Sequence, residues 1–393
     1  MTDITGQEGE TFTLDATVTN QGTIGGVQLV TLTVTNSSGD VVDSETIELD
    51  PEDSESSTWV WETGIGDGGD GDEGVAYTVE LESDDDELVY DVEVEPADLI
   101  SIAYCGQDND VFIEDAQDWT QIISLSESGS TVFTVDYSDD GNYIAYGGGD
   151  ESIEVHNVDD WSREETMTQP SGTVNGVVFS RDVSLIAYTS NDENVYIHST
   201  DEWLLETTIE EANGNVEGVD FSNDGSLIAF TSRDESVYVH DTGSWELEQE
   251  LTDSSTHALD VSFSPDDQYL AYTTGNGNTY IHETTDWTVA ETLNETSVDS
   301  TSVDFSHTDD LLAVSSSDDN VYVYDTGDWS LLETLSHSTE GVNVVKFSPD
   351  GSVISYAGID AEVYIHNTED WSLEETLDLA DNTIEDLDWE PII

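Results

Sequence analysis

Basic residues are almost absent from this sequence. It holds four Lys and Arg residues against 91 Asp and Glu residues, which gives a formal net charge of −87. Proteins that bind nucleic acid by displacing counterions need a basic surface. The composition therefore excludes nucleic acid as a charge-driven partner.

Cysteine and long apolar runs are also scarce. Cys105 is the only cysteine, so the chain cannot form an intramolecular disulfide. No stretch approaches the roughly 18 apolar residues of a membrane-spanning helix, and we expect no membrane insertion. The opening residues, MTDITGQEGE, lack the basic and apolar regions of a secretory signal, so we expect none.

The acidic residues are spread along the whole chain. A compact body of this charge repels itself at low salt, whereas at about 1 M salt the Debye length is about 3 Å and the repulsion is largely screened. Uniform acidity with little lysine resembles the proteins of salt-accumulating halophilic archaea and of their viruses, so high KCl or NaCl is the expected medium. The alternatives, a nucleic-acid mimic or a cation buffer, would gather the charge on one face.

Three sets of residues recur every 42 positions. The first is Trp119, Trp161, Trp203, Trp245, Trp287, Trp329 and Trp371. The second is Tyr137, Phe179, Phe221, Phe263, Phe305, Phe347 and Trp389. The third is Tyr104, Tyr146, Tyr188, Phe230, Tyr272, Val314 and Tyr356. A period of this length with strand-like content is typical of a β-propeller built from four-stranded blades.

One repeat illustrates a blade. Residues 216–221 and 226–232 predict strands a and b, joined by a Ser-Asn-Asp-Gly turn. Residues 237–242, with two-residue alternation, predict strand c, and residues 246–251 predict strand d. No segment sustains a 3.6-residue apolar period, so we expect almost no helix.

The repeats begin and end out of phase. Residues 98–128 contain strands b, c and d without a strand a, and the C-terminal NTIEDLDWEPII is a strand a with nothing after it. Joining the two completes a seventh blade and removes open sheet edges. We therefore predict an all-β fold in which residues 97–393 form a seven-bladed β-propeller closed by the C-terminal strand.

This pattern resembles the WD40-type seven-bladed β-propeller family over residues 98–393. The family's aspartate in the b–c turn matches Asp108, Asp150, Asp192, Asp234, Asp318 and Asp360, with Asn276 in the remaining blade. Its Ser-Pro-Asp-Gly turn matches residues 348–351. The resemblance implies protein partners. We expect the turn residues to stabilise their own turns, and contact with a partner is the alternative.

Two features depart from that family. The Gly-His dipeptide before strand a is missing, and the tryptophan of the Trp-Asp dipeptide is replaced. The replacements are Glu114, His156, His198, His240, His282, Tyr324 and His366. Equivalent strand-c atoms of neighbouring blades lie on the order of 12 Å apart, whereas Zn–N bonds are about 2 Å, so the histidines cannot converge on a metal. We expect structural histidines packed between blades, with a pH switch as the alternative.

The only lysine, Lys346, lies one position before the strand-a aromatic. The same position holds Asp304 and Asp388 in the two adjacent blades. We therefore predict that Lys346 bridges Asp304 and Asp388 near the propeller axis. A lysine exposed at the channel mouth is the alternative.

Residues 1–96 differ from the rest, with six or seven short alternating strands and no basic residue. This pattern predicts an antiparallel β-sandwich and resembles the immunoglobulin-like, adhesion-related domains of archaeal surface proteins. In GDGGDGDEG, residues 66–74, the side chains of Asp70, Asp72 and Glu73 are candidate Ca²⁺ ligands. The full EF-hand spacing is absent, and a hydrated hairpin loop is the alternative.

The sequence contains no phosphate-binding loop, nucleophile motif or Cys/His metal spacing, so we expect a non-enzymatic protein without a cofactor. The first interpretation is a virion surface appendage or decoration protein with a role in host attachment. In it, residues 1–96 dock onto assembly neighbours and the propeller meets a cell-surface or glycan ligand. The alternatives are a cytoplasmic WD40-type protein-interaction scaffold of a halophilic archaeon and, third, a propeller hydrolase.

Overall fold

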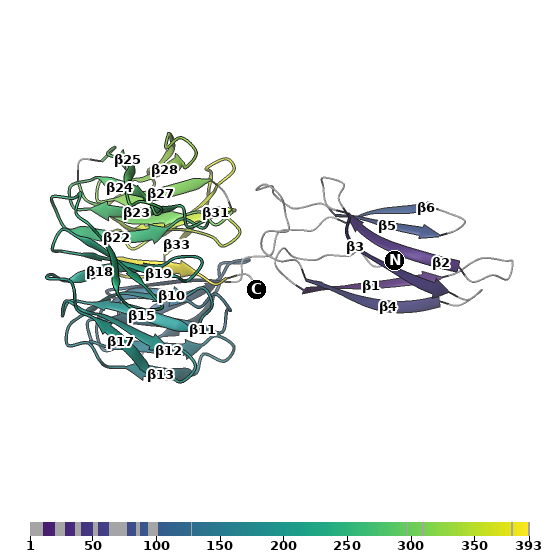
Figure 1. The fold of residues 1–393 in the computed structure, drawn as a ribbon, viewed down its shortest axis with the longest axis horizontal. Helices are drawn as coiled ribbons and strands as arrows, with labels where there is room; N and C mark the ends of the chain where they lie inside the picture. Colours follow the sequence, from purple (N-terminus) through teal and green to yellow (C-terminus); the bar gives the residue numbers. More distant parts are fainter. Residues whose placement is uncertain are drawn as a thin grey trace. The chain divides into compact units, whose positions relative to one another are not determined.

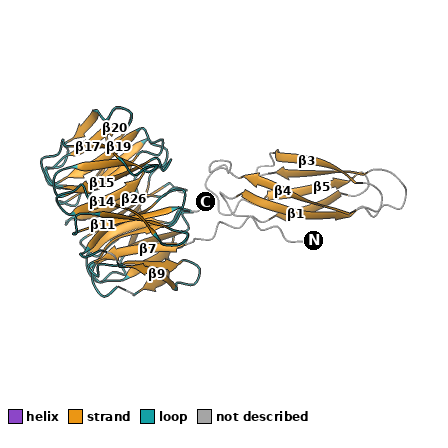
Figure 2. Cartoon of the chain, turned by 90° about the horizontal axis from the view of Figure 1, so that it is seen from below, coloured by secondary structure: helices purple, strands orange, loops and turns teal. Residues whose placement is uncertain are grey.

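The computed structural model describes residues 101–391, except residues 127, 297, 309 and 379, together with six strands of the preceding region (Figure 1). Every regular element among these residues is a β-strand (Figure 2), so the all-β prediction is confirmed there. They include no helix with the length and hydrophobicity that crossing a bilayer requires. The chain forms two compact units, and the predicted boundary at residues 96–97 lies outside the described residues.

Six strands are described in the first unit, and they form two antiparallel sheets. The strands are β1 (Thr11–Thr19), β2 (Gln28–Thr35), β3 (Val41–Leu49), β4 (Ser54–Glu62), β5 (Tyr77–Ser83) and β6 (Glu87–Val92). β1 pairs with β4, and the other sheet has the order β3-β2-β5-β6. The immunoglobulin-like sandwich stays a prediction. The candidate calcium ligands Asp70, Asp72 and Glu73 lie outside the described residues.

The second unit is a propeller of seven four-stranded antiparallel sheets, here called blades I to VII. The inner strands a, from blade I to blade VII, are β34 (Ile384–Trp389), β10 (Val132–Tyr137), β14 (Val174–Phe179), β18 (Val216–Phe221), β22 (Ala258–Phe263), β26 (Ser300–Phe305) and β30 (Val342–Phe347). Strands b are β7 (Ser101–Gly106), β11 (Tyr143–Gly148), β15 (Leu185–Ser190), β19 (Leu227–Ser232), β23 (Tyr269–Thr274), β27 (Leu311–Ser316) and β31 (Val353–Gly358).

The two outer positions of each blade follow in the same order. Strands c are β8 (Val111–Asp115), β12 (Ile153–Asn157), β16 (Val195–Ser199), β20 (Val237–Asp241), β24 (Thr279–Glu283), β28 (Val321–Asp325) and β32 (Val363–Asn367). Strands d are β9 (Gln121–Leu125), β13 (Arg163–Met167), β17 (Leu205–Ile209), β21 (Leu247–Leu251), β25 (Val289–Leu293), β29 (Leu331–Leu335) and β33 (Leu373–Leu377).

Blade I is assembled from both ends of the propeller sequence. Its sheet has the order β34-β7-β8-β9, and β34 pairs antiparallel with β7, with Leu387 opposite Tyr104 and Trp389 opposite Ile102. The predicted closure by the C-terminal strand is therefore confirmed. Because this pairing completes the ring, the stability of the propeller depends on its last strand.

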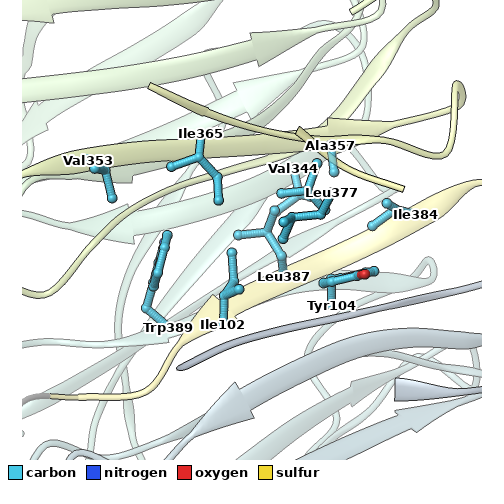
Figure 3. Packing of buried hydrophobic residues seen from close by; sticks show 11 residues of the cluster. Ile102, Tyr104, Val344, Val353, Ala357, Ile365, Leu377, Ile384, Leu387 and Trp389 are labelled. Carbon is cyan, nitrogen blue, oxygen red and sulfur yellow. The ribbon is translucent and has the colours of Figure 1, made fainter. Parts of the chain in front are cut away.

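The apolar core is divided among seven clusters, each of which lies between adjacent blades. In the cluster between blades VII and I, the side chains of Ile102, Leu387 and Trp389 lie against Val353 and Ile365 (Figure 3). Alternate residues of each strand point to opposite faces of the sheet, so both faces of a blade contribute to such clusters. The core therefore holds the ring together as well as each blade.

The recurring tryptophans occupy the next-to-last position of the c–d turns, for example Trp119 between β8 and β9. All seven have positive φ, between 53° for Trp203 and 60° for Trp245 and Trp371. A bulky residue rarely adopts this conformation, which costs about 1–3 kcal/mol unless its surroundings compensate. Each indole packs against one of the clusters between blades, which supplies that compensation. The 42-residue spacing of these tryptophans therefore reflects their packing between the blades.

Leu387→Ala tests the closing strand. Leu387 is fully buried, so we expect the free energy of unfolding to fall by about 2–5 kcal/mol, through lost burial and the cavity left behind. The control is Leu331→Ala, at a site that is 42% exposed, with an expected loss below about 1 kcal/mol. Denaturant unfolding at high salt measures both. Equal losses would contradict the dependence on the last strand.

Candidate functional site

The b–c turns and the d–a loops lie at the same end of the propeller, and hydrogen bonds join them. The aspartates of five b–c turns accept hydrogen bonds from the adjacent d–a loop. These are Asp108 with Asp381 and Asn382, Asp150 with Ser128, Asp192 with Ser171, Asp234 with Asn213, and Asp360 with Ser338 and Thr339. One carboxylate thus fixes two segments, which makes this end, called here the turn face, a preorganised surface.

The other two turn residues bond within their own blade. Asp318 accepts hydrogen bonds from Asn320 and from Tyr322 Oη, and Asn276 from Thr274 Oγ1 and the Asn278 amide. Tyrosines of strand c also donate to turn aspartates in three further blades, at 2.9–3.0 Å. All seven turn residues therefore accept hydrogen bonds, five of them from the adjacent d–a loop and two from within their own blade. Contact with a partner stays a prediction.

Five strand-c histidines are buried, with at most 2% exposure, in the position where the family has tryptophan. In each, Nδ1 lies 2.9–3.2 Å from the carbonyl oxygen of the c–d turn tryptophan, for example His198 with Trp203. Because a carbonyl only accepts, Nδ1 donates. The other nitrogen of His198, Nε2, lies 2.8 Å from Tyr188 Oη. Burial lowers the pKa of His198 and of His366.

Two blades depart from this arrangement. In blade IV, Phe230 replaces the tyrosine, and His240 Nε2 has no hydrogen-bond partner. In blade V, His282 Nε2 lies 3.2 Å from Asp253 Oδ2 without forming a hydrogen bond. In all five blades the Nδ1 hydrogen bond connects strand c to the c–d turn, while a purely structural role of these histidines stays a prediction.

The inner strands are joined from blade to blade by side chains. Each inner strand pairs only with strand b, so its other edge faces the propeller axis with unpaired backbone groups. Aspartates one position before the strand-a aromatic accept hydrogen bonds from the aromatic's amide in the next blade. The pairs are Asp388 with Tyr137, Asp136 with Phe179, Asp220 with Phe263 and Asp304 with Phe347, at 2.7–2.8 Å.

Two further rows of side chains extend these bonds. Three positions before the aromatic, a side-chain oxygen accepts a hydrogen bond of 3.0 Å from a backbone amide of the next blade. The pairs are Asp386 with Val135, Thr134 with Val177 and Asp260 with Val303. Donors one position earlier reach the next blade's carbonyl groups: Asn175 to Val216, Thr301 to Val342 and Asn343 to Ile384. Every one of the seven junctions between blades therefore has at least one such bond.

Asp260 and Asp386 were not predicted from the sequence as members of this set. They lie two residues before Ser262 and Asp388, so strand alternation places them on the same face as the position already noted. That two-residue alternation was the signal available. Together Asp136, Asp220, Asp260, Asp304, Asp386 and Asp388 form, with Lys346, what is called here the axial cluster.

Lys346 supplies the positive charge of the axial cluster. Its Nζ lies 3.6 Å from Asp304 Oδ1, and Asp388 acts on it over a longer distance. Burial by itself lowers the pKa of Lys346, but the charges of Asp304, Asp388 and Asp260 outweigh burial and raise it. Lys346 therefore stays protonated, while its predicted bridge to both carboxylates stays a prediction.

One ammonium group is insufficient for six carboxylates. Burial raises the pKa of Asp220 and of Asp386 to about 7 and that of Asp388 to about 6, although Lys346 lowers all three. Burial and the charge of Asp388 raise the pKa of Asp136 well above its ordinary value. Some of these carboxyls therefore hold a proton near neutral pH.

A second cation lies at the end of the axis formed by the a–b turns. Arg181 of blade III binds Asp139 of blade II at 3.1 Å and contacts His307 of blade VI. Burial, Arg181 and Lys346 lower the pKa of His307 to about 3, so His307 stays neutral and accepts from the guanidinium. This contact joins blades three positions apart, and the sequence analysis did not identify it.

The chemistry of these residues is structural. Nowhere in residues 101–391, as far as they are described, do three His, Cys, Asp or Glu side chains group as a metal ion would require. The axial carboxylates accept backbone hydrogen bonds from the neighbouring blades. Cys105 is buried, and burial raises the pKa of its thiol, which disfavours the reactive thiolate.

Comparison with known families matches three segments of the propeller. Residues 303–391 match the model of the WD40 domain of anaphase-promoting complex subunit 4. Residues 119–157 and 204–241 match the WD domain, G-beta repeat. No curated protein matches the chain. The propeller therefore contains WD40 repeats, as the resemblance in the sequence implied.

Lys346→Met tests the axial cluster. Without the ammonium group the carboxylates lack a nearby positive charge, and we expect the free energy of unfolding to fall by about 1–3 kcal/mol at pH 8. Breaking a fully buried ion pair costs about 3–5 kcal/mol, and the expected loss is smaller because the lysine side chain is 35% exposed. The loss should shrink at pH 5, because Asp386 and Asp388, with pKa values of about 7 and about 6, hold protons there. Arg233→Met, which removes an exposed ion pair with Glu217, should cost below about 1 kcal/mol. Denaturant unfolding at both pH values measures the loss of stability in each variant. A loss in Lys346→Met that is equal at pH 5 and pH 8 would contradict the role of Lys346 in the axial cluster.

Asp220→Asn tests the raised carboxyl pKa. The folded-state pKa of about 7 exceeds the ordinary value of 3.8, so the folded state binds the extra proton. This contribution to stability is complete below about pH 4 and is lost as the pH rises through 7. Asparagine does not titrate but still accepts from Phe263, so the free energy of unfolding should fall less steeply between pH 5 and pH 8. Asp241→Asn is the control, because the pKa of Asp241 is lowered and its carboxyl does not titrate in this window. The stability of this variant should therefore depend on pH as that of the parent protein does.

Proposed function

We propose that this WD40-repeat propeller is a non-enzymatic protein that binds protein partners on its turn face. The observation that carries the proposal is the set of carboxylates that join b–c turns to d–a loops, as Asp192 joins Ser171 and Asp360 joins Thr339. Turns held in this way lose little conformational freedom on binding, and preorganisation of this kind increases affinity.

The turn face also carries apolar side chains in an otherwise acidic surface. Val298 on the d–a loop before blade VI is 40% exposed, and Ile359 in the b–c turn of blade VII is 47% exposed. The centres of protein interfaces are depleted in charge and enriched in apolar contacts. The b–c turn of blade V, Gly275–Asn278, has no acidic residue. Blades V to VII therefore offer the contact region that a protein partner would use.

The more specific interpretations stay predictions. One is a virion appendage with a role in attachment. It would dock through residues 1–96 and present the propeller to a cell-surface or glycan ligand, and the acidic composition is the observation in its favour. A scaffold in the cytoplasm of a halophilic archaeon requires only the turn face. A propeller hydrolase would need converging acid, base and nucleophile groups, and the described turn-face residues already bond one another.

Ile359→Arg tests the turn face. A partner is first captured from the source cells with the full chain at about 1 M KCl, where long-range charge attraction is screened. We expect Ile359→Arg to weaken binding of that partner at least tenfold, because a charge replaces an apolar contact. Titration calorimetry with the purified partner measures the affinity.

The matched control is Leu373→Arg, on the outer strand β33, at a site that is 38% exposed. It should leave the affinity unchanged within about twofold. Equal weakening by both variants, or by neither, would refute binding through the turn face.

A further inference from the structure

The outer strand of blade I differs from the other six because it carries no charge. β9 has the sequence QIISL, and residues 119–126 contain no Asp, Glu, Lys or Arg. The other outer strands read REETM, LETTI, LEQEL, VAETL, LLETL and LEETL, each with at least one glutamate. In a chain with net charge −87, this absence is specific to one edge.

Each outer strand has one edge that pairs with strand c and one edge without a strand beside it in the described propeller. Such an edge presents backbone N–H and C=O groups that can pair with another chain, and charged side chains commonly prevent this. All seven outer strands also start with a β-bulge, so the bulge does not distinguish them. Glutamates protect six edges, and β9 has no such protection.

The side chains of β9 suit a contact. Ile122 is 44% exposed, Gln121 and Ser124 are exposed, and Ile123 is partly buried. Leu125 is buried in the cluster between blades I and II and anchors the end of the strand. The strand is therefore fixed in position while its free edge remains accessible.

We propose that β9 pairs with β9 of a second copy of this chain, antiparallel, about a twofold axis. The two blades I would then form one continuous sheet. A twofold contact brings identical surfaces together, so every glutamate on that surface enters the contact twice, once from each copy. At about 1 M salt the long-range repulsion is screened, but carboxylates in direct contact still repel one another and lose hydration. β9 is the one outer strand of the described propeller that brings no carboxylate into such a contact.

The register of this pairing follows from the sequence. Centred on Ile123, it places Ile123 opposite Ile123, Ile122 opposite Ser124, and Asp118 of the c–d turn opposite Ser128. No acidic residue then faces another. Five residues are a short edge, so we expect a dimer that dissociates on dilution. The contact lies on the rim of the propeller, away from the turn face, so it can fail without affecting the proposed partner binding.

Ile122→Glu is the test, with Leu332→Glu as its matched control. Leu332 occupies the same register in β29 and is 47% exposed, against 44% for Ile122. Sedimentation velocity of the full chain in about 1 M KCl measures the monomer–dimer equilibrium over a range of concentrations. We expect a dimer for the wild type and for Leu332→Glu, and at least a tenfold weaker association for Ile122→Glu.

Ser124→Glu supplies a second variant at an exposed polar site, in case Ile122→Glu does not fold. It should weaken association as well. Hydrogen exchange should show β9 amides protected at high protein concentration and not at low concentration. A wild type that stays monomeric, equal effects of Ile122→Glu and Leu332→Glu, or no effect of either β9 variant would overturn the proposal.

Discussion

The inner strand of a propeller blade can pair with only one neighbour, and the backbone groups on its other edge need partners. Here the adjacent blade supplies them through side chains, and each of the seven junctions has at least one such bond. These bonds connect blade to blade along the inner strands, beside the apolar clusters, which also include inner-strand residues such as Val344 and Leu387. The ring is therefore held by apolar packing between the sheets and by polar bonds at its centre.

The same bonds place acid inside the protein as well as on its surface. A carboxylate is a strong acceptor for a backbone amide, but its burial raises its pKa, as it does for Asp220 and Asp386. Lys346 and Arg181 offset part of this charge, and protons offset another part. High salt can screen the surface charge, whereas the axial cluster depends on its own cations and protons.

Much of the fold could be predicted from the sequence because the 42-residue period is regular. The seven blades, the strand types and the closure of blade I by β34 follow from repeated aromatic positions and alternation. Other features depend on three-dimensional contacts that no period reveals. The positive φ of the tryptophans requires the neighbouring blade, and Arg181 meets His307 only because blades III and VI face each other across the axis. Asp260 and Asp386 occupy a slot that mostly holds other residues, so repetition did not mark them.

The number of blades has a consequence for the axial aspartates. Around the ring the position before the aromatic runs Asp136, Val178, Asp220, Ser262, Asp304, Lys346, Asp388, so acid alternates with other residues. Alternation cannot close on an odd number, and the mismatch falls between blades I and II, where Asp388 and Asp136 are neighbours and the charge of Asp388 raises the pKa of Asp136. An even-numbered ring of these repeats would have no such pair. Because the ring has an odd number of blades, an alternating pattern must leave two acidic positions side by side. In this chain those positions lie on β34, the C-terminal strand that closes the ring, and on the neighbouring β10.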